Sequence, residues 1–291
     1  MRIICLGGSY TGRYLARNFA GEAAVTFLTR NPERLRTEGF SAAAASYLPA
    51  ACDSPASLIL DTVPTYRRDG KLQLPYRSAL SALMEGSRRP VYLHLSTTAV
   101  YPSGFTAQRD GDLPTQDEDT VPHPESGRAK DRLLLEEAII DTYAGARILR
   151  CGGIYGPDRS LATRFSKGDF SRAATGNRMV TRIHVHDLCR LILSFGRLQP
   201  GIEANLVNAV DRRPSSNRET FEHLERVLGI TVPGDWRNEA PKGRMVVSKY
   251  ADSLLGGHYR FPTYREGFAD CLSSPGHQVS DGPTAEEPTW R

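Results

Sequence analysis

The chain has 291 residues, a net charge of +4 and 40% hydrophobic residues, which leaves room for one large α/β unit and a smaller lobe. It has no apolar stretch long enough to span a bilayer, no signal-peptide pattern and no basic cluster with interleaved aromatics. The five cysteines lack a Cys-x-x-Cys spacing, which favours reduced thiols over a zinc site. We therefore expect a cytoplasmic protein without a metal, a membrane or a nucleic-acid partner.

The first thirty residues predict a strand–turn–helix–strand unit that binds a dinucleotide. The apolar run Arg2–Leu6 is typical of a buried parallel strand. The dinucleotide fingerprint needs small residues for a tight turn, for the approach of the pyrophosphate and for helix packing, and Gly7, Ser9 and Gly12 occupy these places. The Ser9 hydroxyl is itself able to meet a phosphate. The predicted cofactor site therefore begins with Gly7, Gly8, Ser9, Tyr10, Thr11 and Gly12.

The end of the second strand indicates which dinucleotide is bound. Val25–Leu28 resumes strand character and is followed by Thr29 and Arg30. NAD-binding proteins usually carry an acid here for the ribose 2′-hydroxyl, whereas an arginine suits a 2′-phosphate. We predict NADP rather than NAD, with an ordinary surface charge as the alternative role of Arg30.

The following strands are predicted to border the same crevice, because ligands bind at the carboxyl ends of parallel strands. Residues 57–62 form the next strand, so Thr62, Val63 and Pro64 are predicted to lie along the cofactor. A helix with Leu80, Leu83 and Met84 leads to the strand Pro90–Ser96. His94 lies within that strand and is interpreted as a core histidine rather than a catalytic one.

The remaining elements alternate in the same way. Residues 105–124 are polar and rich in Asp, Thr and Pro, which predicts a surface loop that either covers a substrate or is decoration. Further elements are predicted in this order: a helix at Lys130–Ile140, a strand at Ala146–Arg150, a strand and helix within Arg182–Leu188, a strand at Leu206–Ala209 and a helix at Phe221–Leu228. Residues 273–291 are predicted to form a disordered tail.

Several stretches, taken together with the Gly7–Gly12 turn, resemble the extended and atypical short-chain dehydrogenase/reductase superfamily. They are Leu95–Tyr101, Ile148–Arg150, Ile154–Pro157, Ile183–Leu188, Asn205–Asn208 and Phe261–Gly267. The likeness is greatest to the NAD(P)-dependent epimerase/dehydratase-like branch. It implies an α/β fold with a Rossmann-type doubly wound parallel sheet and a smaller carboxyl-terminal substrate lobe. We assign 1–154 and about 180–210 to the NADP-binding domain, 155–179 and 211–270 to the lobe, and 271–291 to the tail.

The resemblance implies a catalytic Ser/Thr and a Tyr-x-x-x-Lys pair on one helical face. Thr97 matches the Ser/Thr, with Thr98 as the alternative. One register of the motif keeps Lys130 and puts Ser126 in the place of the tyrosine. The other register, in which Glu136 matches a common acid, gives Arg128 and Arg132. Neither supplies a tyrosine, and His123 and Tyr101 are the nearest upstream candidates.

The predicted catalytic residues are thus Thr97, Ser126 and Lys130, and the predicted substrate contacts are Tyr101, His123, Tyr155 and Arg159. A packing role for Tyr155 stays open, as does a pyrophosphate contact or a surface role for Arg13. His184 and Asp187 match a motif that braces the junction of the two lobes in the family.

Two functions remain. The first is an NADP-dependent oxidoreductase, epimerase or dehydratase that acts on a small polar substrate, and the second is a sensor that holds NADP without turnover. The resemblance also allows a homodimer, since family members often pair through helices of the nucleotide domain.

Overall fold

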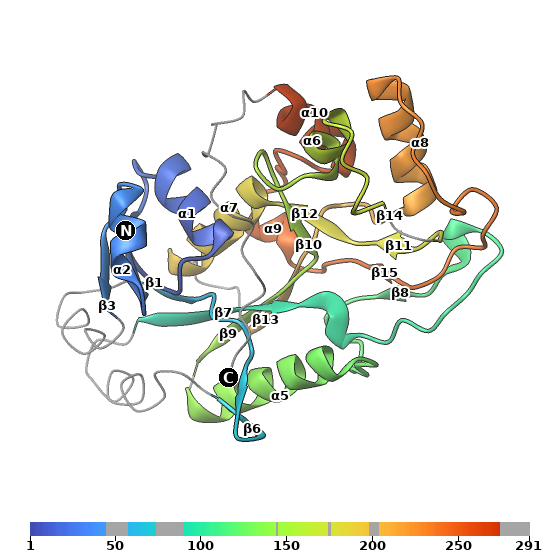
Figure 1. Ribbon diagram of the computed structural model, residues 1–291. Helices are drawn as coiled ribbons and strands as arrows, with labels where there is room; N and C mark the ends of the chain where they lie inside the picture. Colours follow the sequence, from blue (N-terminus) through green and yellow to red (C-terminus); the bar gives the residue numbers. More distant parts are fainter. Residues whose placement is uncertain (45–57, 74–89, 144, 174–175, 198–203, 274–291) are drawn as a thin grey trace.

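The computed structural model describes residues 1–44, 58–73, 90–143, 145–173, 176–197 and 204–273. Its centre is a seven-stranded sheet in the order β13-β9-β7-β4-β1-β2-β3, in which every neighbouring pair is parallel (Figure 1). The strands are β1 (Arg2–Leu6), β2 (Ala24–Thr29), β3 (Ala42–Ala44), β4 (Leu58–Asp61), β7 (Val91–Thr97), β9 (Arg147–Cys151) and β13 (Leu206–Ala209). The strand order reverses beside β1, as in doubly wound sheets, which confirms the predicted fold class.

Helices cover both faces of this sheet. Figure 1 shows α1 (Tyr10–Asn18) and α7 (Val185–Gly196) on one side and α5 (Gly127–Thr142) on the other. Successive strand residues point to opposite faces, so Leu58 and Leu60 join the apolar cluster under α1 and α7, while Ile59 packs with Leu135 and Ile139 of α5. Because both faces are buried, the strands are continuous apolar runs. A shorter helix, α2 (Pro32–Thr37), follows β2.

A third apolar cluster lies in the carboxyl-terminal part of the chain. It is built around α6 (Leu161–Ser166), α8 (Asn217–Leu228) and α10 (Tyr264–Ser273), which Figure 1 shows together beyond one end of the sheet. Its largest fully buried side chains are Phe165, Phe221, Trp236 and Phe268. Short strand pairs connect this part to the sheet: β10 (Gly153–Tyr155) with β12 (Arg182–His184), β11 (Met179–Val180) with β14 (Ser215–Ser216), and β8 (Thr115–Gln116) with β15 (Met245–Val246).

Asp187 ties α7 to this carboxyl-terminal part. Its carboxylate is fully buried and accepts hydrogen bonds from the backbone amides of Arg260 (2.9 Å) and Phe261 (2.8 Å). The ring of His184 lies 3.9 Å from that of Phe261, and its Nδ1 caps α7 by accepting from the His186 amide. These contacts match the bracing role predicted for His184 and Asp187.

Some predicted boundaries differ from the observed ones. The predicted loop at 105–124 contains the 3₁₀ helix η3 (Asp110–Asp112) and strand β8, whose partner β15 lies more than a hundred residues along the chain. The predicted tail begins too early, because α10 continues through Ser273 and buries Cys271 in the third cluster. The predicted helix with Leu80, Leu83 and Met84 and residues 274–291 lie outside the described residues.

Candidate functional site

The Gly7–Gly12 turn joins β1 to α1 in a shape that requires its glycines. Gly7 has a φ of 85°, a conformation that side chains rarely adopt. A Cβ on Gly12 would lie 2.7 Å from the Cys5 Sγ and 2.9 Å from the Phe27 ring, so only glycine lets α1 approach the sheet this closely. Gly8 packs against Leu35 of α2, where a Cβ would lie 3.2 Å from the leucine. The turn therefore has the small-residue geometry of the predicted dinucleotide site.

The start of α1 presents backbone donors beside this turn. Ser9 is the N-cap, and its Oγ accepts from the Gly12 amide at 3.1 Å. The first amides of a helix have no partner within the helix, and those of Tyr10 and Thr11 have no acceptor among the described residues. An anion beside them would also be favoured by the helix dipole. The Ser9 hydroxyl proton remains able to donate. These residues fit a diphosphate group.

Thr62 holds the end of β4 next to the turn through a hydrogen bond. Its Oγ1 donates to the Leu6 carbonyl oxygen at 2.7 Å, and a Cβ on Gly7 would lie 3.3 Å from the same Oγ1. The Val63 amide donates to the Asp61 carboxylate at 2.9 Å. The predicted cofactor-lining segment Thr62–Pro64 therefore lies next to the glycine turn, at the carboxyl edge of the sheet.

Arg30 is exposed directly after β2, whose last residue is Thr29, and the Asn31 amide donates to the Thr29 Oγ1 at 3.5 Å. Arg34 is one turn further, on α2, and its Nε lies 3.8 Å from Glu38. Arg13 of α1 pairs with the same glutamate at 3.3 Å, so the structure gives Arg13 an ion-pair partner on the protein. Arg34 is a second cation near the strand end that the sequence analysis did not single out.

Thr97 ends β7 at the same edge. Its Oγ1 accepts from the Ala99 amide at 3.2 Å and caps the 3₁₀ helix η2 (Thr98–Val100), while the side chain stays half-buried. Thr98, the alternative, is buried. The Arg244 guanidinium reaches this point from the carboxyl-terminal part and donates to the Thr98 carbonyl oxygen at 2.6 Å. Sequence reasoning missed Arg244, because no motif links position 244 to this edge.

The orientation of α5 separates the two registers of the catalytic motif. Residues four apart share a helix face, and the face with Arg132 and Glu136 is the one turned toward the sheet. Glu136 is 1% exposed and pairs with Arg150 of β9 at 2.8 Å, and it also accepts from the Ser96 hydroxyl. Ser126 is the N-cap of α5, with its Oγ accepting from the Ala129 amide, and Lys130 is exposed.

Lys130 and Arg132 are two residues apart, which is about 200° around a helix, so Lys130 points away from the face that contacts β7. The register that supplied the predicted Ser126 and Lys130 is therefore not the register that faces the sheet. Arg132 takes the inward place instead, where its Nη1 lies 3.2 Å from the Nε2 of His94.

The two upstream candidates for the missing tyrosine have different environments. Tyr101 is fully buried, its hydroxyl donates to Asn208 at 2.9 Å, and its ring lies 4.9 Å from the Arg150 guanidinium. Tyr101 therefore packs in the interior, contrary to its prediction as a substrate contact. His123 is exposed, and its backbone amide donates to the Val100 carbonyl oxygen at 2.9 Å, which places it beside η2.

The two residues predicted on the loop after β9 have different environments. Tyr155 is 5% exposed and packs edge-on against His184 and Phe268, so the structure gives it the packing role. Arg159 is exposed, and its guanidinium lies 5.9 Å from the centre of the Tyr10 ring. Arg159 therefore reaches the glycine turn, at the border between the predicted cofactor and substrate regions.

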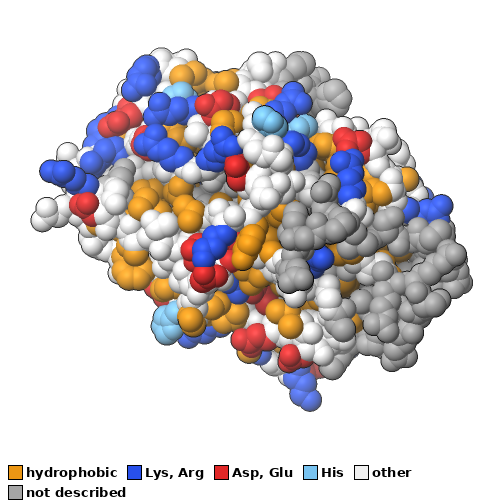
Figure 2. All heavy atoms as spheres, turned by 180° about the vertical axis from the view of Figure 1, so that it is seen from behind, with side chains coloured by type: hydrophobic (Ala, Val, Ile, Leu, Met, Phe, Trp, Pro, Cys, Tyr) orange, Lys and Arg blue, Asp and Glu red, His pale blue; other side chains and the backbone are white. Residues whose placement is uncertain are grey.

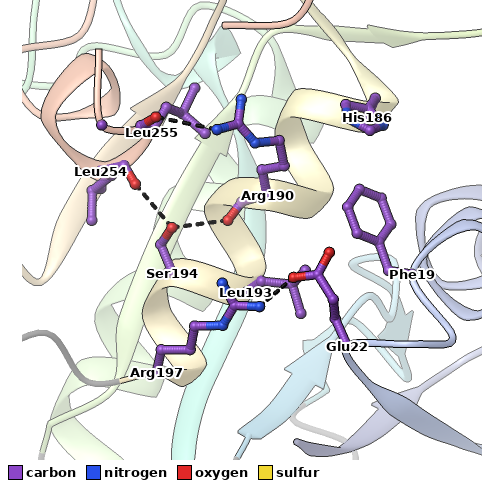
Figure 3. Close-up of a pocket in the computed structure, with 10 residues that line it drawn as sticks. Phe19, Glu22, His186, Arg190, Leu193, Ser194, Arg197, Leu254 and Leu255 are labelled. Carbon is purple, nitrogen blue, oxygen red and sulfur yellow. Dashed lines mark hydrogen bonds and ion pairs between the residues drawn. The ribbon is translucent and has the colours of Figure 1, made fainter. Parts of the chain in front are cut away.

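A cavity of about 370 Å³ lies elsewhere, between α7, the end of α1 and α9 (Ala251–Leu254) (Figure 3). Several of its polar side chains have protein partners: Arg197 pairs with Glu22, and the Ser194 hydroxyl bonds to the Arg190 and Leu254 carbonyl oxygens. A Cβ on Gly196, at the end of α7, would meet the side chain of Met1. This contact places the cavity toward the amino edge of the sheet, opposite the glycine turn.

Charged side chains of both signs are interspersed over the described part of the face in Figure 2. Many of them form ion pairs, such as Arg265 with Glu219 at 2.9 Å and Arg164 with Asp169 at 2.7 Å. Among the described residues, no helix is both long enough and apolar enough to cross a bilayer.

Comparison with solved structures identifies the fold as that of NAD(P)-dependent epimerases and dehydratases. Human epimerase family protein SDR39U1, solved with NADPH, matches at 16% identity over 94% of this chain and 100% of its own, with a TM-score of 0.69. The dTDP-glucose 4,6-dehydratase of Bacillus anthracis with NAD matches at 15% identity over 94% and 95%, with a TM-score of 0.69. The UDP-glucuronic acid 4-epimerase of Bacillus cereus with NAD matches at 16% over 93% and 96%, with a TM-score of 0.65.

Neither a protein-family model nor a curated protein sequence matches the chain. The structural matches therefore confirm the predicted resemblance at the level of the fold, which is that of proteins solved with a nicotinamide dinucleotide.

Proposed function

We propose that the chain is a cytoplasmic NADP-dependent oxidoreductase, epimerase or dehydratase that acts on a small polar substrate. The observation that carries this proposal is the placement of Arg30 directly after β2, beside a glycine turn whose shape excludes larger side chains. The fold match to SDR39U1, which was solved with NADPH, supports it.

The protein's own groups bind the diphosphate and the 2′-phosphate of the cofactor. The amides of Tyr10 and Thr11 and the Ser9 hydroxyl hold the diphosphate at the positive end of α1. The guanidinium groups of Arg30 and Arg34 neutralise the 2′-phosphate, as charge-assisted hydrogen bonds to phosphate do. When bound, the nicotinamide supplies the oxidation and reduction chemistry.

The substrate side of the site contains a hydroxyl and a cation. Among the described residues, Thr97 Oγ1 is engaged only as an acceptor by the Ala99 amide, so its proton is able to hydrogen-bond a substrate oxygen. Arg244 approaches the same strand end through the Thr98 carbonyl oxygen. The aromatic cluster around Phe165 and Phe268 supports the assignment of residues 155–179 and 211–270 as the substrate lobe.

One observation favours the second function, a protein that holds NADP without turnover. The sequence of α5 contains no tyrosine, and the Tyr101 hydroxyl is bonded to Asn208 in the interior. A positioned acid–base group typically contributes roughly 10²- to 10⁴-fold to a rate. A chain without one has a correspondingly weak capacity for proton transfer at a carbonyl.

The two functions are separated by measuring binding and turnover on the same preparation. Binding is followed by calorimetry, and turnover by nicotinamide absorbance with NADPH or NADP and libraries of small carbonyl and hydroxyl compounds. The enzyme proposal expects binding together with oxidation or reduction of the nicotinamide by at least one compound class. Tight NADP binding with no turnover across the libraries would select the sensor, and no binding of any nicotinamide dinucleotide would contradict both.

A further inference from the structure

A buried chain of polar contacts crosses the sheet just below the glycine turn, on the side covered by α5. Asp61 is the last residue of β4, and its Oδ2 lies 2.6 Å from the Tyr92 hydroxyl and 2.8 Å from the His94 Nδ1. The other imidazole nitrogen of His94, Nε2, lies 3.2 Å from the Arg132 Nη1. A guanidinium can only donate, so Nε2 accepts and Nδ1 carries the proton that His94 donates to Asp61.

This network of polar contacts has a carboxylate, Asp61, at one end and a guanidinium, Arg132, at the other. His94 is fully buried and Asp61 is 6% exposed. Burial alone would raise the pKa of Asp61, but the contacts with His94, Tyr92 and the Val63 amide outweigh it and lower that pKa. Burial lowers the pKa of Arg132, and the Asp61 charge acts in the opposite direction. A buried carboxylate is stabilised by nearby positive charge, and the Arg132 guanidinium lies on the far side of His94 from Asp61.

The sheet register places the Asp61–His94–Arg132 contacts under the expected path of a bound dinucleotide. Leu6, Asp61 and His94 pair side by side across β1, β4 and β7, and Gly7 follows Leu6 directly. Ligands of doubly wound sheets extend from such a turn across the carboxyl ends of the neighbouring strands. A dinucleotide held at Gly7 would therefore lay its second half over the end of β4, above Asp61 and Arg132.

The Arg132 guanidinium keeps donors available for a ligand. Nη1 is directed at His94, whereas Nε and Nη2 have no hydrogen-bond acceptor among the described residues. The Arg132 side chain is half-buried and so remains partly accessible to solvent. One edge of the guanidinium is therefore fixed by the protein, and the other is open.

We propose that Arg132 binds the nicotinamide ribose of the cofactor, and that Asp61 and His94 are positioning residues which hold its guanidinium in place. This inference rests on the proposed function, because it assumes that a dinucleotide occupies the glycine turn. It assigns the cation of the nicotinamide half to an arginine on the inward face of α5 and not to Lys130.

The test compares two ligands that share the adenosine half of the cofactor. NADPH contains the nicotinamide ribose, and adenosine 2′,5′-bisphosphate lacks it. Calorimetric titration of Arg132→Gln should show NADPH affinity weakened roughly tenfold or more, which corresponds to the loss of a hydrogen bond from a charged group. The affinity for the bisphosphate should stay within about twofold of the native protein. The matched control Arg226→Gln, an exposed arginine on α8, should leave both affinities unchanged.

Variants of His94 test the positioning role. His94→Leu removes the acceptor and should reproduce the NADPH-selective loss, whereas His94→Gln offers both an acceptor and a donor and should retain most of the NADPH affinity. Arg132→Lys keeps the buried charge should the glutamine variant fold poorly, and it should lose NADPH affinity to a smaller extent.

The outcomes are distinguishable. Native protein that binds neither ligand would contradict the proposed function and this inference with it. Native protein that binds both ligands, with Arg132 variants that change neither affinity or weaken both equally, would overturn the inference and leave the proposed function intact.

Discussion

The Thr97 hydroxyl has an observed structural contact and a proposed chemical one. It caps η2 through the Ala99 amide, and in the proposed function its proton hydrogen-bonds a substrate oxygen. We expect Thr97→Val to lower any turnover roughly 10²-fold, the usual effect of removing one positioned donor to a developing oxyanion. Thr97→Ser keeps both the cap and the proton and should restore most of the rate. Steady-state rates on an identified substrate provide the measurement, and equal rates for the valine and serine variants would remove Thr97 from the site.

Gly12 controls the distance between α1 and the sheet. A Cβ there would lie 2.7 Å from Cys5 Sγ and 2.9 Å from the Phe27 ring, and both side chains are fully buried. Gly12→Ala should therefore destabilise the fold by about 1–3 kcal/mol, as overpacking of a core does. Urea unfolding measures this loss. Gly21→Ala is the matched control, because nothing lies within 4 Å of its added carbon. Equal stability of the two variants would show that the turn tolerates a larger residue.

At the scale of single residues, the sequence predicted the turn better than the catalytic set. The glycine spacing predicts the turn because its residues are local neighbours. Whether Lys130 or Arg132 faces the sheet depends on partners from distant strands. Arg132 contacts His94, and Glu136 pairs with Arg150. No pattern within α5 reveals those partners.

The α5 helix shows why its inward face was hard to predict. Leucines and isoleucines occupy several sides of the helix, and Leu134 and Ile140 are 46% and 51% exposed. The polar residues Arg132 and Glu136 lie on the side that faces the sheet. Apolar periodicity, the main sequence signal for helix orientation, is therefore weak in this element.

The β12–α7 junction predicts a pH dependence of stability. Burial, with smaller effects from His186 and Arg260, lowers the pKa of His184 to about 3 from 6.5. Between these two values the unfolded chain binds a proton that the folded chain does not, so stability falls as the pH is lowered. One such group changes the free energy of unfolding by at most about 1.4 kcal/mol per pH unit.

We therefore expect His184→Asn, whose side chain still caps α7, to unfold with a shallower dependence on pH between 6.5 and 4. Urea unfolding across this range gives the slope. His258→Asn, at an exposed position, should leave the slope unchanged. An unaltered slope in the His184 variant would show that another group carries the dependence.

For the whole molecule, six of the seven strands of the central sheet were predicted from the sequence, whereas β3 (Ala42–Ala44) and the contacts of the carboxyl-terminal part were not. Strands such as Arg2–Leu6 and Leu58–Asp61 are mostly apolar because helices cover both faces, so they are recognisable in the sequence. Pairs such as β8 with β15 contain two residues per strand and join distant segments. Two residues carry no periodicity, so these pairs are visible only in the folded chain.

The proposed preference for NADP over NAD tests the account most directly, because it depends on both the glycine turn and Arg30. Calorimetric titration of the native protein should show NADP bound more tightly than NAD. Arg30→Gln should weaken NADP binding roughly 10- to 100-fold, the loss expected for one charged hydrogen-bonding group, and leave NAD binding unchanged, with Arg226→Gln as the control. Tighter binding of NAD than of NADP by the native protein, or an equal loss for both dinucleotides in Arg30→Gln, would contradict the account.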